Sequence, residues 1–294
     1  MNVTKLASNF SILSMLNRLR NPVLPGFHTH FKRYNSNGNV SICANNVEGF
    51  AWIKMNKRPV NTMDARLLVD LEDAFGKLEN DASCRGVILT SSLTDVFSAG
   101  LDISVLNSNH IADFDKMWEA LQNLWLRVYC SPLAIIAAIN GNAPAGGCMI
   151  AIACDHRIMA RGNYHIGISA PRLGLMLPPW VQRAMENTIG HRHAEEALGK
   201  ATLYSVDEAF KLGLIDSIVE PKKLEEAAQE EMNKMLKIPD HARILSKQLM
   251  RLKDIQYLRD NQKNDLEYTR NHVMLKETQQ QIKKFLNNLK KQKK

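Results

Sequence analysis

The sequence lacks the patterns that mark several common classes of cofactor-dependent enzyme. None of G-x-x-x-x-G-K-[ST], H-E-x-x-H or G-x-G-x-x-G occurs in its 294 residues, which argues against a P-loop, a zinc-protease site and a dinucleotide site. The five cysteines contain no C-x-x-C pair and no zinc-like spacing to histidine, and their odd number argues against a disulfide framework. We therefore predict no resident cofactor and no metal.

Long apolar runs are also missing. The one stretch that resembles a membrane span lies between Arg127 and Asp155, where no charged residue occurs. Prolines, glycines and asparagines interrupt it, so its apolar runs fall short of the roughly 18 residues that a span requires. A buried strand, a glycine-rich turn and a buried helix explain it better, and we expect no membrane span.

Charge is unevenly distributed. The chain has a formal net charge of +8, but no acidic residue precedes Glu48, and lysines crowd the last residues from Lys283 onward. The part in between is close to neutral, and aromatic residues make up only 6% of the chain. A basic footprint for nucleic acid is therefore not expected in the folded part.

The N-terminal 35 residues have the composition of a mitochondrial transit peptide. They contain no acid and are rich in serine and asparagine, and Leu6, Phe10, Leu13 and Leu16 recur at helical spacing. A merely disordered N-terminus is the alternative. The pattern predicts location in the mitochondrial matrix, with a transit peptide that spans about residues 1–35.

The rest of the chain alternates between strand and helix patterns, which favours a mixed α/β domain. We expect a helix starting between Asn61 and Asp64, a helix through Trp118 and Val128, and a helix opened by the capping box of Ser205 and Glu208. Further segments are expected as strands at 49–55, 87–89, 133–139, 156–160 and 214–219, a turn at 140–147, and a short helix at 148–154. No linker separates independent domains, so we expect a core at 45–236 and a helical region at 237–294.

Two turns of small residues follow apolar strands. They are the segments 98–102 and 140–148. A turn without large side chains can leave backbone N–H groups accessible, and two of these could converge on one oxygen as an oxyanion hole. Equally, the glycines could serve only the close packing of helix on strand.

The two turns together resemble the signature of the crotonase, or enoyl-CoA hydratase/isomerase, family. The matching letters are F-S-A-G-L-D and I-N-G-x-x-P-A-G-G-C. Four further segments resemble the 3,2-enoyl-CoA isomerases of that family: 77–81, 85–91, 186–192 and 238–243. The resemblance runs from about residue 48 to the C-terminus.

This resemblance implies an α/β fold of stacked ββα turns with a C-terminal helical trimerisation region. It implies a homotrimer, which could mix with a paralogue, and an acyl-CoA or enoyl-CoA thioester as the partner, so that coenzyme A arrives with the substrate. By carry-over, Ala99 and Gly146 supply the two oxyanion N–H groups. The substrate-binding residues would be Ala99, Gly100, Leu101, Asp102, Ile103, Gly146 and Ser169.

The sequence departs from the family pattern where the isomerases carry their base. Such an isomerase moves a double bond from position 3 to position 2 by proton shuttling through one glutamate. By register that glutamate position is Ala170 here, and a methyl group carries no proton. Met149 occupies the first glutamate position of the hydratases, which argues against water addition. Asp102 is better interpreted as holding its turn, and His165 as structural.

Three functional hypotheses remain open. The first is an isomerase-lineage enzyme of unsaturated fatty-acid β-oxidation with weak or lost activity. The second is a non-catalytic acyl-CoA-binding subunit, and the third is another crotonase reaction such as thioester hydrolysis. The lysine-rich tail is interpreted as a solvated helix end, although one of its lysines could contact the phosphates of coenzyme A.

Overall fold

The computed structural model describes residues 31–34, 38–45, 48–107 and 111–292. Its centre is a seven-stranded sheet with the order β1-β2-β3-β4-β6-β8-β11. The strands are β1 (Phe31–Tyr34), β2 (Val40–Asn45), β3 (Phe50–Met55), β4 (Gly86–Ser91), β6 (Ala134–Ile139), β8 (His156–Ala160) and β11 (Ser217–Val219). The first three are antiparallel neighbours, and from β3 to β11 every pair is parallel.

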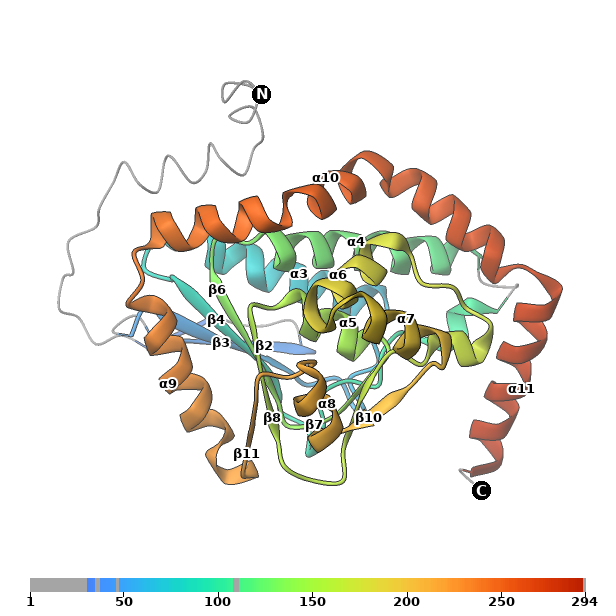
Figure 1. Ribbon diagram of the computed structural model, residues 1–294, viewed down its shortest axis with the longest axis horizontal. Helices are drawn as coiled ribbons and strands as arrows, with labels where there is room; N and C mark the ends of the chain where they lie inside the picture. Colours follow the sequence, from blue (N-terminus) through green and yellow to red (C-terminus); the bar gives the residue numbers. More distant parts are fainter. Residues whose placement is uncertain (1–30, 35–37, 46–47, 108–110, 293–294) are drawn as a thin grey trace.

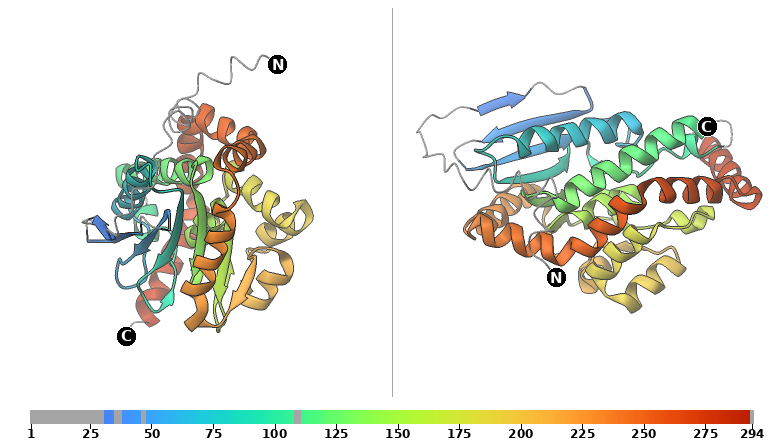
Figure 2. Two further views of the ribbon diagram at one scale, coloured as in Figure 1. Left: turned by 90° about the vertical axis from the view of Figure 1, so that its left-hand side faces the viewer. Right: turned by 90° about the horizontal axis from the view of Figure 1, so that it is seen from above.

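Alternating residues of the central strands point to opposite faces, and both faces are buried. In β6, Ile135 and Ala137 belong to the larger core, whereas Ile136 and Ala138 belong to a second core. Helix α9 (Leu224–Leu236) closes this second core, and its contacts run to β4, β6 and β8. Helices cover both faces for this reason (Figures 1 and 2).

The larger core lies under α3 (Ala65–Glu79), α4 (Ile111–Cys130), α5 (Gly146–Ala153) and α6 (Pro179–Ile189). Asp64 caps α3 by accepting a hydrogen bond from the Leu67 N–H, as the expected start at 61–64 requires. Two shorter helices, α7 (His191–Gly199) and α8 (Val206–Leu212), follow α6. The capping box of Ser205 and Glu208 is present at the start of α8.

The predicted strands at 49–55, 87–89, 133–139 and 156–160 are confirmed as β3, β4, β6 and β8, and β11 occupies the end of 214–219. The prediction of a plain turn at 140–147 is wrong. Residues Gly141–Pro144 form β7 in a second sheet with the order β10-β9-β7-β5. The other members are β5 (Asp95–Val96), β9 (His165–Gly167) and β10 (Leu203–Ser205).

Strand β7 has a physical reason to escape sequence patterns. It is four residues long and contains Gly141 and Pro144, which are unfavourable in most strands. A Cβ at Gly141 would lie 1.9 Å from the Asp95 carbonyl carbon, so β5 and β7 can approach each other only because Gly141 lacks a side chain. This second sheet brings the two small-residue bends together.

The C-terminal region consists of α10 (Asp240–Val273) and α11 (Lys276–Gln292). Helix α10 runs along α4 on the outside of the molecule, and α11 turns down at its far end (Figure 1). The described residues also include the short 3₁₀ segments η1 (Ile103–Leu106), η3 (Ala170–Leu173) and η4 (Pro221–Lys223). Helix α11 contacts η1 and η3. Residues 1–30, most of the predicted transit peptide, lie outside the described residues, and 31–34 belong to β1.

Candidate functional site

The first bend, residues 97–102, is fixed by buried hydrogen bonds. Asn61 is fully buried and has φ +49°. Its side-chain amide donates to the Phe97 carbonyl oxygen over 2.9 Å, and its backbone carbonyl accepts from the Ser98 hydroxyl over 2.7 Å. Met63 adds two backbone bonds, one to the Gly100 carbonyl over 2.8 Å and one from the Asp102 N–H over 3.0 Å. The bend is therefore rigid before any ligand arrives.

The prediction that Ala99 supplies an oxyanion N–H conflicts with these bonds. The Ala99 N–H donates to the Val60 carbonyl oxygen over 2.9 Å, so it is already used inside the protein. The Gly100 N–H donates to the Ser98 hydroxyl over 3.1 Å. The N–H of Leu101 has no partner among the described residues, which makes it the available donor of this bend.

The second bend, in the segment 140–148, contains a strained residue. Ala145 has φ +48° and ψ −114°, a conformation that alanine rarely adopts and that concentrates at functional sites. Its N–H donates to the Gly167 carbonyl oxygen over 2.8 Å. Gly146 then begins the buried helix α5, and its N–H has no partner among the described residues. A free N–H at a helix N-terminus favours a negatively charged oxygen.

The two bends touch each other. A Cβ built on Gly100 would lie 2.9 Å from the Gly146 nitrogen, and a Cβ on Gly146 would lie 3.1 Å from the Leu101 nitrogen. These separations are too short for ordinary side chains. The glycines thus serve close packing, and the same packing brings the unused N–H groups of Leu101 and Gly146 into one neighbourhood.

A cavity of about 320 Å³ opens beside the bends. Its lining includes Ala99, Leu101, Ile103, Gly146 and Ser169, which are five of the seven predicted substrate-binding residues. Gly100 and Asp102 do not line it. Asp102 instead holds η1, because its carboxylate accepts from the Ser104 N–H over 2.9 Å and from the Ser104 hydroxyl over 2.7 Å.

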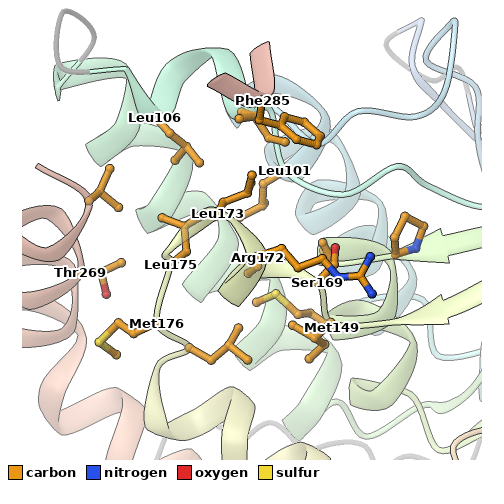
Figure 3. Close-up of a pocket in the computed structure, with 18 of the residues that line it drawn as sticks. Leu101, Leu106, Met149, Ser169, Arg172, Leu173, Leu175, Met176, Thr269 and Phe285 are labelled. Carbon is orange, nitrogen blue, oxygen red and sulfur yellow. The ribbon is translucent and has the colours of Figure 1, made fainter. Parts of the chain in front are cut away.

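Ala170 and Met149 also line this cavity. Most of the side chains around it are apolar, as Figure 3 shows. No aspartate, glutamate, histidine, cysteine, tyrosine or lysine occurs among its lining residues in the described part of the chain. Among the described lining residues, Arg172 alone has an ionisable side chain. His165 is exposed in β9 and is not one of these residues.

Several lining residues come from helices that the sequence motifs did not point to. Phe114 and Trp118 come from α4, Thr269 and Val273 from α10, and Phe285 from α11. Helical periodicity identified Trp118 as a buried residue, but periodicity does not distinguish a cavity wall from a core. The Asp265 carboxylate fixes this wall by accepting from the Trp118 indole over 2.9 Å.

Within the described residues, no group of three His, Cys, Asp or Glu side chains could hold a metal ion. None of the described helices is long and apolar enough to cross a membrane. Cys148, in α5, is fully buried, and burial raises the pKa of its thiol to about 12. It therefore remains protonated and unreactive at neutral pH.

Comparison with known proteins agrees with this geometry. Residues 45–293 match the family described as enoyl-CoA hydratase/isomerase. The chain is 39% identical to the mitochondrial enoyl-CoA delta isomerase 1 of Rattus norvegicus over 88% of this chain and 90% of the rat protein, and 39% identical to that of Homo sapiens over 83% and 82%. It is 32% identical to the short-chain-enoyl-CoA hydratase of Clostridium acetobutylicum over 68% of this chain and 77% of that protein.

A solved structure is also similar. The crystal structure of human mitochondrial delta3-delta2-enoyl-CoA isomerase superimposes with a TM-score of 0.85 at 38% identity and covers 87% of this chain and 100% of its own. The expected crotonase fold is thereby confirmed. With its two touching bends and its apolar cavity, this chain belongs to the enoyl-CoA hydratase/isomerase family.

Proposed function

We propose that this chain binds acyl-CoA thioesters as a member of the enoyl-CoA isomerase lineage, and that its isomerase activity is weak or lost. One observation carries the proposal: within the described part of the chain, two N–H groups beside the cavity have no partner and no carboxylate lines it. The named function of the 39%-identical relatives supports the lineage and the class of ligand.

In the proposed complex the thioester carbonyl oxygen accepts hydrogen bonds from the N–H groups of Leu101 and Gly146. Both residues line the cavity, and Gly146 adds the positive end of the α5 dipole. Such donors stabilise the negative charge that builds up on this oxygen when a proton leaves the neighbouring carbon. The apolar walls accept the hydrocarbon chain of the acyl group.

Among the lining residues that the structure describes, no side chain can accept the proton. Ala170 occupies the position predicted for the base, and Ser169 and Met149 beside it carry no ionisable group. A positioned general base contributes about 10²- to 10⁴-fold to the rate of such a step. Binding and enolate stabilisation therefore remain, while double-bond migration slows by that factor. A binding subunit without catalytic activity is the limiting case.

We further propose that the chain acts in the mitochondrial matrix on intermediates of unsaturated fatty-acid oxidation. The mitochondrial names of its relatives support this location, as does the acid-free N-terminal sequence.

The test compares wild type with Ala170→Glu and Ala170→Gln in turnover of a 3-enoyl-CoA, with calorimetry of acyl-CoA binding for all three. We expect binding in every case and an increase of about 10²- to 10⁴-fold in turnover for the glutamate variant alone, because only it restores a carboxylate. The glutamine variant is the matched control for size. Fast turnover by wild type would show that residue 170 does not limit the reaction, and failure of wild type to bind acyl-CoA would remove the proposed function.

A further inference from the structure

The described lining of the cavity contains one positively charged side chain and no negatively charged one. The positive charge belongs to Arg172, which lines the cavity and is also exposed to solvent. Figure 3 shows its side chain among the apolar residues that surround the cavity. No carboxylate of the lining neutralises it. A lone cation beside an apolar surface attracts anionic groups of a ligand.

The guanidinium is held in place by the protein on one edge only. Its Nε donates to the Ala201 carbonyl oxygen over 3.0 Å. Ala201 is buried and has φ +49°, which is an uncommon conformation for alanine. Across the described residues, the bond to Ala201 is the one hydrogen bond found for the Arg172 side chain, and no ion pair or acceptor is found for its two terminal nitrogens. The edge that carries them remains available for a ligand.

We propose that Arg172 binds an anionic group of the bound thioester, a carboxylate or a phosphate, and so selects the class of ligand. The inference rests on the proposed function, because it takes an acyl-CoA thioester as the occupant of the cavity. Guanidinium groups bind both kinds of oxyanion through paired N–H donors, and these charge-assisted bonds are stronger than neutral ones.

The position of Arg172 favours a carboxylate on the acyl part. Arg172 belongs to the same four-residue segment, η3, as Ala170, and both residues line the cavity in which the acyl chain is proposed to lie. An isomerase needs a negative base in this segment, whereas here the segment supplies a positive charge. A carboxyacyl thioester places its charge opposite this cation, and a neutral acyl chain leaves the cation without a partner.

The experiment measures the dissociation constants of succinyl-CoA and butyryl-CoA, which share a four-carbon acyl chain and differ in a terminal carboxylate. Wild type is compared with Arg172→Gln, Arg172→Lys and Arg161→Gln. Arg161 is the control, since it pairs with Asp207 and Glu220 away from the cavity. A third ligand, butyryl-pantetheine, lacks the phosphates of coenzyme A. Thermal unfolding of each variant monitors the loss of the Ala201 contact.

If Arg172 binds the acyl carboxylate, Arg172→Gln weakens the binding of succinyl-CoA by about five- to tenfold and leaves the binding of butyryl-CoA unchanged, and Arg172→Lys recovers part of the lost affinity. If Arg172 binds a phosphate, the substitution weakens the binding of both CoA thioesters equally and leaves the binding of butyryl-pantetheine unchanged. Equal affinities in wild type and Arg172→Gln for all three ligands overturn the proposal. Binding of butyryl-CoA by wild type tests the proposed function separately.

Discussion

Gly100 is the residue on which the geometry of the site depends most directly. Its φ of +90° lies in the region that favours glycine, and its α-carbon faces the start of α5. A Cβ there would lie 2.9 Å from the Gly146 nitrogen and 3.0 Å from the Ala145 Cβ. Neither neighbour can withdraw easily, because Ala145 is fixed to Gly167 and Gly146 begins a buried helix.

We predict that Gly100→Ala lowers the free energy of unfolding by about 1–3 kcal/mol, because the methyl group overpacks the contact and alanine disfavours this φ. The substitution should also weaken acyl-CoA binding, because the methyl group crowds the Gly146 N–H. The matched control is Gly199→Ala, at the last position of α7, where a Cβ would have no neighbour within 4 Å. It should be neutral or stabilising by up to about 1 kcal/mol. Denaturant unfolding and calorimetry measure both quantities. Similar stabilities for the two variants would contradict the contact between the bends.

Among the elements, α10 is attached to the core partly through a buried group of charges. Asp155, between α5 and β8, accepts from Lys247 over 2.9 Å and lies 3.1 Å from the Arg251 guanidinium. It also accepts from the Ile135 N–H over 2.8 Å. Burial alone would raise the pKa of Asp155, but the positive charges of Lys247 and Arg251 outweigh it and hold this pKa below its usual value. The attachment therefore depends on an ionised carboxylate.

We predict that Asp155→Asn destabilises the protein by about 3–5 kcal/mol, because it leaves the Lys247 ammonium buried without its counter-charge. The control is Glu225→Gln in the exposed pair with Lys54, which should cost at most about 1 kcal/mol. Because the folded-state pKa of Asp155 is lowered, its stabilisation is present above the ordinary aspartate pKa near 3.9 and is lost as the pH falls through the lower value. Urea unfolding at neutral and acid pH measures the difference in free energy of unfolding between wild type and Asp155→Asn. We expect this difference to become smaller in acid, and a difference that stays constant with pH would count against this assignment.

At the scale of the whole molecule, the outer side of α10 exposes apolar residues. Leu245, Leu249 and Met250 are 43%, 64% and 84% exposed, although the helix covers the length of the molecule (Figures 1 and 2). Apolar side chains gathered in this way mark a surface that another protein covers. The trimer implied by the family resemblance would supply such a cover, and we propose this face as part of its interface.

We predict that light scattering gives a mass about three times that of one chain, and that Leu249→Glu lowers it, because a buried unpaired carboxylate opposes association. Phe210→Glu, on α8, changes a comparably exposed apolar residue outside α10 and serves as the control. A single-chain mass for wild type, or dissociation by the control alone, would argue against this interface.

The family, the order of the main strands and helices, and the two small-residue bends could all be predicted from the amino-acid sequence. Apolar periodicity and capping residues are local properties of the chain, and so Asp64 and Ser205 could be assigned from neighbouring residues alone. The absence of a carboxylate at position 170 could also be predicted from the sequence, because it depends only on the residue at that position.

Which N–H groups of the bends have no partner among the described residues, and which side chains surround them, depends on the three-dimensional fold. The bend at 97–102 contains several backbone N–H groups. The Val60 carbonyl, from a distant part of the chain, accepts from the Ala99 N–H, and this leaves the Leu101 N–H as the available donor. The proposed role of Arg172 also depends on the fold, because the lining residues around it come from α4, α10 and η3 as well as from the bends. Hydrogen bonds and cavity walls join distant segments, and no local pattern records those contacts.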